Sequence, residues 1–162
     1  METLDVINEK DEVVGKVSKK EIYDKLLPHR IVHILIFNDN GEIALQLSSE
    51  KKDFCPRYWG TSVGGHVRSG ESCEEAALRE FSEELGTTSN IDFAYKDWYG
   101  DKRGLKLLLT TFKAVSNGPF NINSDEVEKV EFFSLDKIKD MIKSGEKFHP
   151  ELLFLLKNHF DI

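Results

Sequence analysis

Three glutamates, Glu80, Glu83 and Glu84, lie close together in the segment GHVRSGESCEEAALREFSEELGT, which covers residues 65–87. In a helix, residues three and four positions apart share a face, so these carboxylates would repel one another by about 0.2–0.5 kcal/mol per pair. No lysine in the segment relieves this repulsion. Because a hard cation such as Mg²⁺ binds carboxylate oxygens, the cluster favours a metal site. A solvated acidic helix face is the alternative interpretation.

The ends of the predicted helix are marked by local signals. Ser72 and Glu75 have the S-x-x-E spacing of a capping box, which predicts that the helix begins there. Gly86 suits the left-handed backbone that ends a helix. One helix face gathers apolar residues that should pack on a sheet, namely Ala77, Leu78, Phe81 and Leu85. We expect the face that carries the glutamates to point toward a cleft or solvent.

Residues that flank the acidic cluster strengthen the metal interpretation. Gly64 and Gly65 permit either a close approach of another group to the backbone or a positive φ. Arg79 precedes Glu80 in the sequence, where its guanidinium can hold a carboxylate in a fixed orientation. A freely solvated acidic face requires none of these neighbours.

The same residues resemble the signature motif of the Nudix family. The resemblance rests on the spacing of Gly65, Glu71 and the run REFSEELG at residues 79–86. One position departs from the family pattern, because Thr87 stands where an aliphatic residue is usual. The resemblance implies an α/β fold, in the form of an α/β/α sandwich with a mixed β-sheet between helices. It also implies a hydrolase that acts on diphosphate bonds.

The family pattern implies roles for individual residues. It assigns a Mg²⁺ ion, or Mn²⁺, to three carboxylates and one backbone carbonyl, which are those of Glu80, Glu83, Glu84 and Gly64. Glu83, Glu80 and Arg79 would form the catalytic group. Glu71 and Arg79 would hold the loop and the helix together. Metal ions screen the charge of a diphosphate, orient its phosphates and acidify a bound water.

The general base and the phosphate contacts are less closely defined by the pattern. The base is either a glutamate of the motif or an acid from a distant loop, where the candidates are Asp125, Glu126 and Glu128. Cations just upstream of the motif could bind phosphate oxygens, and these are Lys51, Lys52 and Arg57. We prefer Arg57, because a planar guanidinium suits phosphate. Three aromatic residues could stack on a base or pack in the core: Trp98, Tyr99 and Phe120.

Nearly the whole chain resembles one branch of the family, the isopentenyl-diphosphate isomerase-like Nudix group. Matching segments include KDFCPRYWGTSVGGHV and NSDEVEKVEFFSLDKI. Gly64 stands where the isomerase needs a catalytic cysteine, and residues 104–107 lack its acidic motif. His29 and His66 match histidines of the isomerase metal site, although the remaining ligands are missing. Residues 47–48, Leu-Ser, replace an arginine pair of the related hydrolases.

Hydrophobic patterning predicts the remaining elements. Strands are expected at residues 4–8, 13–17, 31–37, 42–47, 58–63, 91–98, 105–115 and 127–133. The third and fourth of these should form a hairpin. Further helices are expected at residues 18–27, 135–143 and 150–160. Because no linker or repeat interrupts the pattern, we expect residues 1–162 to form a single Nudix hydrolase domain.

Composition limits the classes of function. Hydrophobic residues make up 40% and charged residues 31% of the chain, which is typical of a globular protein. No apolar run reaches the roughly 18 residues of a membrane span. The first residues lack the features of a signal peptide, so we expect a cytoplasmic protein. Cys55 and Cys73 form no CxxC pair, so we expect structural or incidental thiols. A net charge of −7 argues against polymeric nucleic acid as a partner.

The leading hypothesis is a Mg²⁺-dependent pyrophosphohydrolase. It would cleave a phosphoanhydride in a nucleoside di- or triphosphate or in another diphosphate-linked small molecule. We expect a monomer or homodimer that does not associate with a membrane. One alternative is an isopentenyl-diphosphate isomerase-like enzyme, which Gly64 disfavours. The other alternative is a non-catalytic ligand-binding module, which the intact glutamate cluster disfavours.

Overall fold

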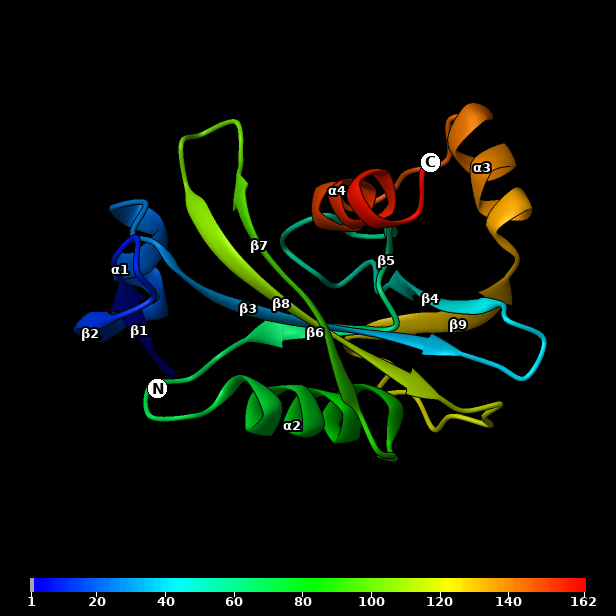
Figure 1. Ribbon diagram of the computed structural model, residues 1–162, viewed down its shortest axis with the longest axis horizontal. Coiled ribbons are helices and arrows are strands. Elements are labelled where there is room, and N and C mark those ends of the chain that lie inside the picture. Colours follow the sequence, from blue (N-terminus) through cyan, green and yellow to red (C-terminus); the bar gives the residue numbers. More distant parts are fainter. Residues whose placement is uncertain (1) are drawn as a thin grey trace.

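The structure is a computed structural model that describes residues 2–162. Its elements, in chain order, are β1 (Thr3–Ile7), β2 (Val13–Ser18), α1 (Lys19–Asp24), β3 (His29–Phe37), β4 (Ile43–Ser48), β5 (Trp59–Gly60), β6 (Val63–His66), α2 (Cys73–Leu85), β7 (Asp92–Gly100), β8 (Lys106–Val115), β9 (Val127–Phe133), α3 (Leu135–Lys143) and α4 (Pro150–His159). Figure 1 shows how these elements are arranged.

A mixed sheet forms the centre of the protein. Strands β5, β4, β3, β8 and β7 follow one another across it, while β6 pairs with β3 and β9 pairs with β4. β3 and β8 run parallel, and the other pairs are antiparallel. Helix α2 lies on one face of the sheet, and α3 and α4 lie on the other (Figure 1). The predicted α/β/α sandwich with a mixed sheet is therefore confirmed.

The sheet divides along one edge of β3. Strand β6 pairs with residues 31–34 of β3. Strand β4 meets β3 at a single pair, Phe37 with Ile43, and forms most of its ladder with β9. The expected hairpin of residues 31–37 and 42–47 is thus closed only at its turn. Strands β4 and β6 diverge from the same edge and leave a fork between them.

A buried serine marks the base of this fork. The strand predicted at residues 58–63 is wrong, because Thr61 and Ser62 divide it into β5 and β6. The Ser62 hydroxyl accepts a hydrogen bond from the N–H of Ile36 at 2.8 Å and donates to the carbonyl of Ala44. The Ser62 side chain takes the place of a backbone hydrogen bond to β3 and of another to β4, so these two strands can separate.

Helix α1 is shorter than the sequence predicts. The expected helix at residues 18–27 begins after Ser18, whose hydroxyl caps it, and ends at Asp24. Leu26 has a φ of 53°, a left-handed conformation that cannot continue a helix. The helix predicted from Ser72 and the strand predicted at residues 31–37 are confirmed.

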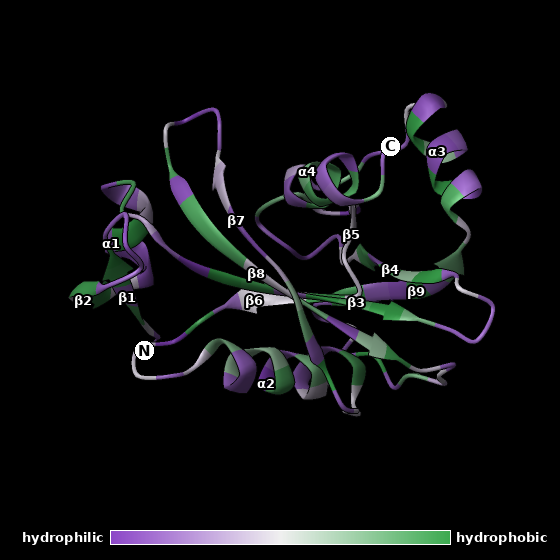
Figure 2. Cartoon of the chain, viewed as in Figure 1, coloured by the Kyte–Doolittle hydropathy of each residue, from purple (hydrophilic) through white to green (hydrophobic). Residues whose placement is uncertain are grey.

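Two layers of apolar side chains pack on the faces of the sheet. Helix α2 contributes Ala76, Ala77, Phe81 and Leu85 to the layer on its face. Helices α3 and α4 contribute Ile138, Met141, Leu152 and Leu156 to the other. Figure 2 shows hydrophobic colouring along the central strands and hydrophilic outer turns on α2. Full burial of a Leu or Phe side chain contributes about 1.5–3 kcal/mol, so these layers fix α2 and α4 on the sheet.

Within residues 2–162, no helix is long and apolar enough to cross a membrane.

Candidate active site

Helix α2 is held at both ends by the predicted signals. The Ser72 hydroxyl accepts the N–H of Glu75 at 3.1 Å, and the Glu75 carboxylate accepts the N–H of Ser72 at 3.1 Å, which completes the capping box. Gly86 is left-handed, with a φ of 69°. A β-carbon on Gly86 would lie 2.6 Å from the carbonyl oxygen of Asn121. The glycine therefore also lets the chain at Asn121 pack against the end of the helix.

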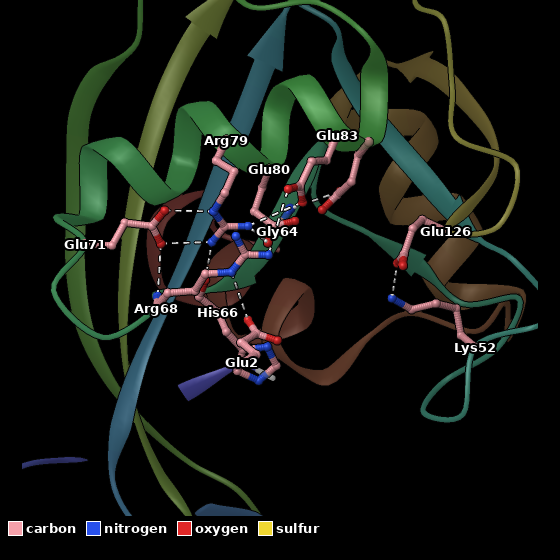
Figure 3. Close-up of polar contacts among 11 residues, drawn as sticks. Glu2, Lys52, Gly64, His66, Arg68, Glu71, Arg79, Glu80, Glu83 and Glu126 are labelled. Carbon is pink, nitrogen blue, oxygen red and sulfur yellow. Dashed lines mark hydrogen bonds and ion pairs between the residues drawn. The ribbon is translucent and has the colours of Figure 1, made fainter. Parts of the chain in front are cut away.

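Arg79 joins the loop before α2 to the carboxylates on its cleft side (Figure 3). Its Nε and Nη2 donate to the two oxygens of Glu71 at 2.7 and 2.9 Å. Its Nη1 donates to Glu80 at 2.7 Å and to Glu83 at 3.3 Å, and Nη2 also reaches the carbonyl of His66 at 3.0 Å. The bonds to Glu71 and then to Glu80 raise the pKa of Arg79, and the bond from Arg79 lowers the pKa of Glu71.

Glu84 is buried, with 6% exposure, although it belongs to the helix face that the sequence predicts to point toward a cleft or solvent. Its Oε1 accepts a hydrogen bond from Gln46 Nε2 at 2.6 Å and lies 3.4 Å from the N–H of Gly64. Burial and the adjacent carboxylate of Glu80 raise the pKa of Glu84 well above its usual range. Two neighbouring carboxylates with little solvent share either a proton or a cation. Gln46 was not predicted to belong to the site.

The two glycines of β6 let side chains approach from opposite faces of the strand. A β-carbon on Gly65 would lie 2.4 Å from Cδ of Glu80, and one on Gly64 would lie 3.1 Å from Nδ1 of His33. The predicted close approach is therefore confirmed. Neither residue has a positive φ, so of the two alternatives the structure shows the close approach.

Carboxylates are ligands that a divalent cation prefers, although two of the three form ion pairs with Arg79. Glu80 and Glu83 both pair with Arg79, and the Glu83 side chain is 48% exposed. Among residues 2–162, no three side chains of His, Cys, Asp or Glu form a ready-made metal shell. A cation would nevertheless relieve the repulsion between Glu80 and buried Glu84, so the donor set fits Mg²⁺.

A cleft of about 920 Å³ occupies the fork between β4 and β6. The α2 carboxylates Glu80, Glu83 and Glu84 line it together with Gly64 and Gly65. Gln46 of β4, Thr61 and the loop residue Lys52 also line it, as do Asn123, Asp125 and Glu126. The structure thus brings the three glutamates of the motif, two predicted phosphate contacts (Lys51 and Lys52) and two predicted base candidates to a single cavity.

The predicted phosphate contacts and the predicted bases pair with one another. The three ion pairs join the loop after β4 to the segment before and within β9, and they are Lys51–Asp125 at 2.9 Å, Lys52–Glu126 at 2.6 Å and Arg57–Glu128 at 2.5 Å. Figure 3 shows Lys52 and Glu126 across the cleft from Glu83. Arg57 is not among the residues that line the cleft.

The aromatic candidates are distributed over three environments. Phe120 packs on the α2 core layer with its ring 6.1 Å from that of Phe132, and it is not among the residues that line the cleft. Trp98 lines a separate pocket beside β1 and β7. Tyr99 lines that pocket and the cleft. Of the three, only Tyr99 is placed where it could contact a ligand of the cleft.

The two histidines that match isomerase ligands form part of a buried ring cluster. The rings of His29 and His66 stack with centroids 5.6 Å apart. Burial, followed by the charges of Lys19 and His29, lowers the pKa of His66 to about 3. Burial also raises the pKa of Tyr23, so the Tyr23 hydroxyl donates to Nε2 of a neutral His66 at 2.5 Å. Sequence reasoning missed Tyr23 as a neighbour of this site.

Comparison with protein-family models finds a NUDIX domain at residues 27–156. The chain belongs to the Nudix family. Nudix hydrolases act on diphosphate bonds, and this protein is an enzyme of that class. The uncharacterized Nudix hydrolase YfcD of Escherichia coli strain K12 is 33% identical over 138 residues, which cover 85% of this chain and 76% of YfcD. The uncharacterized Nudix hydrolase lin0387 of Listeria innocua is 33% identical, with 98% and 96% covered.

Solved structures share the Nudix fold of the chain. The structure of DR0079 from Deinococcus radiodurans is 27% identical and superposes with a TM-score of 0.83 over 98% of this chain and 99% of DR0079. The NUDIX domain of Shewanella oneidensis NrtR, solved with ADP-ribose, is 17% identical with a TM-score of 0.64 over 87% of this chain and 96% of that domain. The latter likeness concerns the fold alone.

Proposed function

We propose that this Nudix protein hydrolyses a phosphoanhydride bond in a nucleoside di- or triphosphate, or in another diphosphate-linked small molecule, with Mg²⁺ as cofactor. The observation that supports this most is that Glu80 and the buried Glu84 line one cleft beside the backbone of Gly64. Such a pair of carboxylates needs a proton or a cation. Membership of the Nudix family supplies the class of reaction.

The proposed metal ligands are oxygen donors from α2 and β6, namely Glu80, Glu83, Glu84 and the carbonyl of Gly64. Mg²⁺ prefers such oxygens, and Mn²⁺ accepts the same donors. When bound, the ion neutralises phosphate charge and acidifies water. Arg79 keeps Glu80 in place through its 2.7 Å bond, and Glu71 keeps Arg79 in place. Glu83, Glu80 and Arg79 are therefore our proposed catalytic group.

We assign phosphate binding to Lys52 and Arg57. A phosphate in the cleft would compete with Glu126 for the ammonium of Lys52, because both are anionic acceptors. The released Glu126 carboxylate is then one candidate for the base that takes a proton from the attacking water, and Glu83 is the other. Arg57 would first have to leave Glu128 to reach the cleft.

Two alternative functions are less well supported. An isomerase-like enzyme needs a thiol where Gly64 stands, and His33 leaves little room for a side chain there. A non-catalytic ligand-binding module does not need three carboxylates on the cleft side of α2. Charge supports small molecules over nucleic acid polymers, since the net charge is −7. We further propose a single domain that works in the cytoplasm as a monomer or homodimer.

Phosphate release from a panel of nucleoside di- and triphosphates and dinucleoside diphosphates tests the proposal. We expect hydrolysis of at least one compound that requires Mg²⁺ or Mn²⁺ and stops on addition of EDTA. Conversion of isopentenyl to dimethylallyl diphosphate, followed in parallel, should be absent. Isomerase activity without hydrolysis of any compound would replace the proposal with the first alternative, and inactivity in both assays would favour the binding module.

A further inference from the structure

A buried acid–imidazole pair lies in the cleft apart from the α2 carboxylates. Glu151 of α4 places its Oε1 2.8 Å from Nε2 of His33 on β3. The other ring nitrogen of His33, Nδ1, lies 2.7 Å from the hydroxyl of Thr61. The side chains of His33 and Glu151 are 8% and 13% exposed. The phosphoanhydride chemistry described above uses neither of them.

Both ring nitrogens of His33 are held by neighbouring groups. The Thr61 hydroxyl lies 2.7 Å from Nδ1 of His33 and 2.9 Å from the carbonyl of Val63, so it links the ring to strand β6. Burial opposes ionisation of Glu151, but the hydrogen bond and charge of His33 prevail and lower the pKa of Glu151. Because an ionised carboxylate cannot donate, Nε2 of His33 donates to Oε1 of Glu151. This hydrogen bond fixes the orientation of the Glu151 carboxylate.

Glu151 lies across β6 from the α2 carboxylates. Successive residues of a strand face opposite sides of the sheet, and Gly65 faces Glu80 whereas Gly64 faces His33. Both sides nevertheless belong to the same cleft, because the fork between β4 and β6 opens through the sheet. A molecule bound by its phosphates beside Glu80 would therefore extend its other end toward Glu151.

Glu151 has one oxygen free to bind that end. In the part of the chain that the structure describes, Oε2 of Glu151 has no hydrogen-bond donor, whereas Oε1 is held by His33. Three aromatic rings also line the cleft, those of Tyr23, His66 and Phe54, and Phe54 packs edge-on against His149, two residues before Glu151. An ionised carboxylate among rings accepts hydrogen bonds and repels phosphate.

We propose that Glu151 determines specificity by accepting a hydrogen bond from a donor on the organic end of the substrate, on a ribose hydroxyl or the amino group of a base. The inference rests on the proposed function and narrows its substrate to nucleoside-type diphosphates. Inorganic polyphosphate would bring a like charge to Glu151, and a hydrocarbon diphosphate would offer its free oxygen no donor. His33 acts only as a positioning residue.

Matched substrates and one isosteric variant test this inference. Values of kcat/KM are measured with Mg²⁺ for ribonucleoside diphosphates, their 2′,3′-dideoxy counterparts and methyl diphosphate, using the parent protein and Glu151→Gln. The amide keeps the shape and can still accept from His33, but it turns a donor toward the cleft. Loss of a hydrogen bond to a charged acceptor should lower kcat/KM for the dideoxy compounds about 10- to 100-fold in the parent, mainly through KM. In Glu151→Gln the difference should shrink to about threefold or less.

The outcomes separate the inference from the proposed function. If cytidine and uridine diphosphates differ in a Glu151-dependent way while the dideoxy compounds do not, the donor is the base amino group and the inference stands. If parent and variant show the same substrate ratios, the inference is overturned and the hydrolase assignment survives. If neither protein hydrolyses any phosphoanhydride, the proposed function itself is wrong. If Glu151→Gln fails to fold, the substrates are compared in the parent protein alone. Equal values of kcat/KM with and without the ribose hydroxyls and the base amino group would then exclude a hydrogen bond to Glu151.

Discussion

Gly65 lies against Glu80 so closely that a β-carbon would come within 2.4 Å of the carboxyl carbon. The strand β6 and the helix α2 meet at this point, and the absent side chain leaves the space that the Glu80 carboxylate fills. The relationship explains why a glycine is needed here without a positive φ. It also fixes where the proposed metal ligand can stand relative to the backbone of Gly64.

Gly65→Ala should fold and lose activity. The atoms that a methyl group would meet belong to the flexible end of Glu80, so the side chain can move without breaking the backbone. A displacement of about 1 Å in an active site can lower the rate 100-fold, and we expect a fall in kcat/KM of about that size. Gly100→Ala is the control, since nothing lies within 4 Å of its β-carbon. Equal activity of the two variants would show that the position of Glu80 is unimportant.

Arg79→Lys should reduce both activity and stability. A lysine cannot reproduce the two parallel bonds to Glu71 together with those to Glu80 and the His66 carbonyl. Loss of hydrogen bonds to partly buried charges costs about 1.5–3 kcal/mol. Urea unfolding measures this change, and phosphate release measures the accompanying loss of rate. Wild-type stability in Arg79→Lys would contradict the bracing role of Arg79.

Lys52→Ala should weaken substrate binding more than Arg57→Ala. Lys52 lines the cleft, whereas Arg57 pairs with Glu128 outside it. Removal of one charged contact to phosphate should raise KM about tenfold, with a smaller effect on kcat. Steady-state kinetics on the best substrate of the panel provide the comparison. A larger effect of Arg57→Ala would mean that the loop rearranges on binding, so that its guanidinium reaches the phosphates.

Stability should fall as the pH decreases below about 6.5. Burial lowers the pKa of His29 and His149 below that of an unfolded histidine, so the unfolded chain binds protons that the folded protein does not. Each such histidine can cost up to about 1.4 kcal/mol per pH unit. Carboxylates with a lowered pKa, such as Glu71, lose their contribution only at lower pH.

His149→Asn provides the matched variant for this pH dependence. The His149 ring caps α4 by accepting the N–H of Glu151 at 3.1 Å, and asparagine can cap without titrating. We expect a shallower fall in the free energy of unfolding between pH 6.5 and 5, measured by urea titration at several pH values, about 1.4 kcal/mol less per unit at most. The same slope in both proteins would rule out His149 as a source of the acid sensitivity.

Local features of this fold could be predicted from the sequence, and distant ones could not. The bounds of α2 follow from Ser72, Glu75 and Gly86, since capping depends on residues three positions apart and on one glycine. The burial of Glu84 depends on Gln46, which arrives from another strand. No periodicity in α2 distinguishes this glutamate from its exposed neighbour Glu83.

The fork between β4 and β6 and the pair of His33 and Glu151 also depend on contacts between residues that are distant in the sequence. Ser62 ends β5 by bonding two other strands, which a local pattern at residues 58–63 does not reveal. His33 and Glu151 are 118 positions apart in the sequence and meet only because α4 packs on the sheet beside β3. Spacing and charge identified the glutamate cluster and the family resemblance gave it a role, but neither contained a signal for Glu151.

Titration of Mg²⁺ or Mn²⁺ into the protein by calorimetry tests the central claim most directly. The parent and Glu74→Gln, which changes an exposed glutamate in the first turn of α2, should bind the ion at millimolar concentration or below. Glu83→Gln should bind it at least about tenfold more weakly while remaining folded. Equal affinity in all three proteins, or no binding by any of them, would contradict the assignment of a metal to the carboxylates of α2.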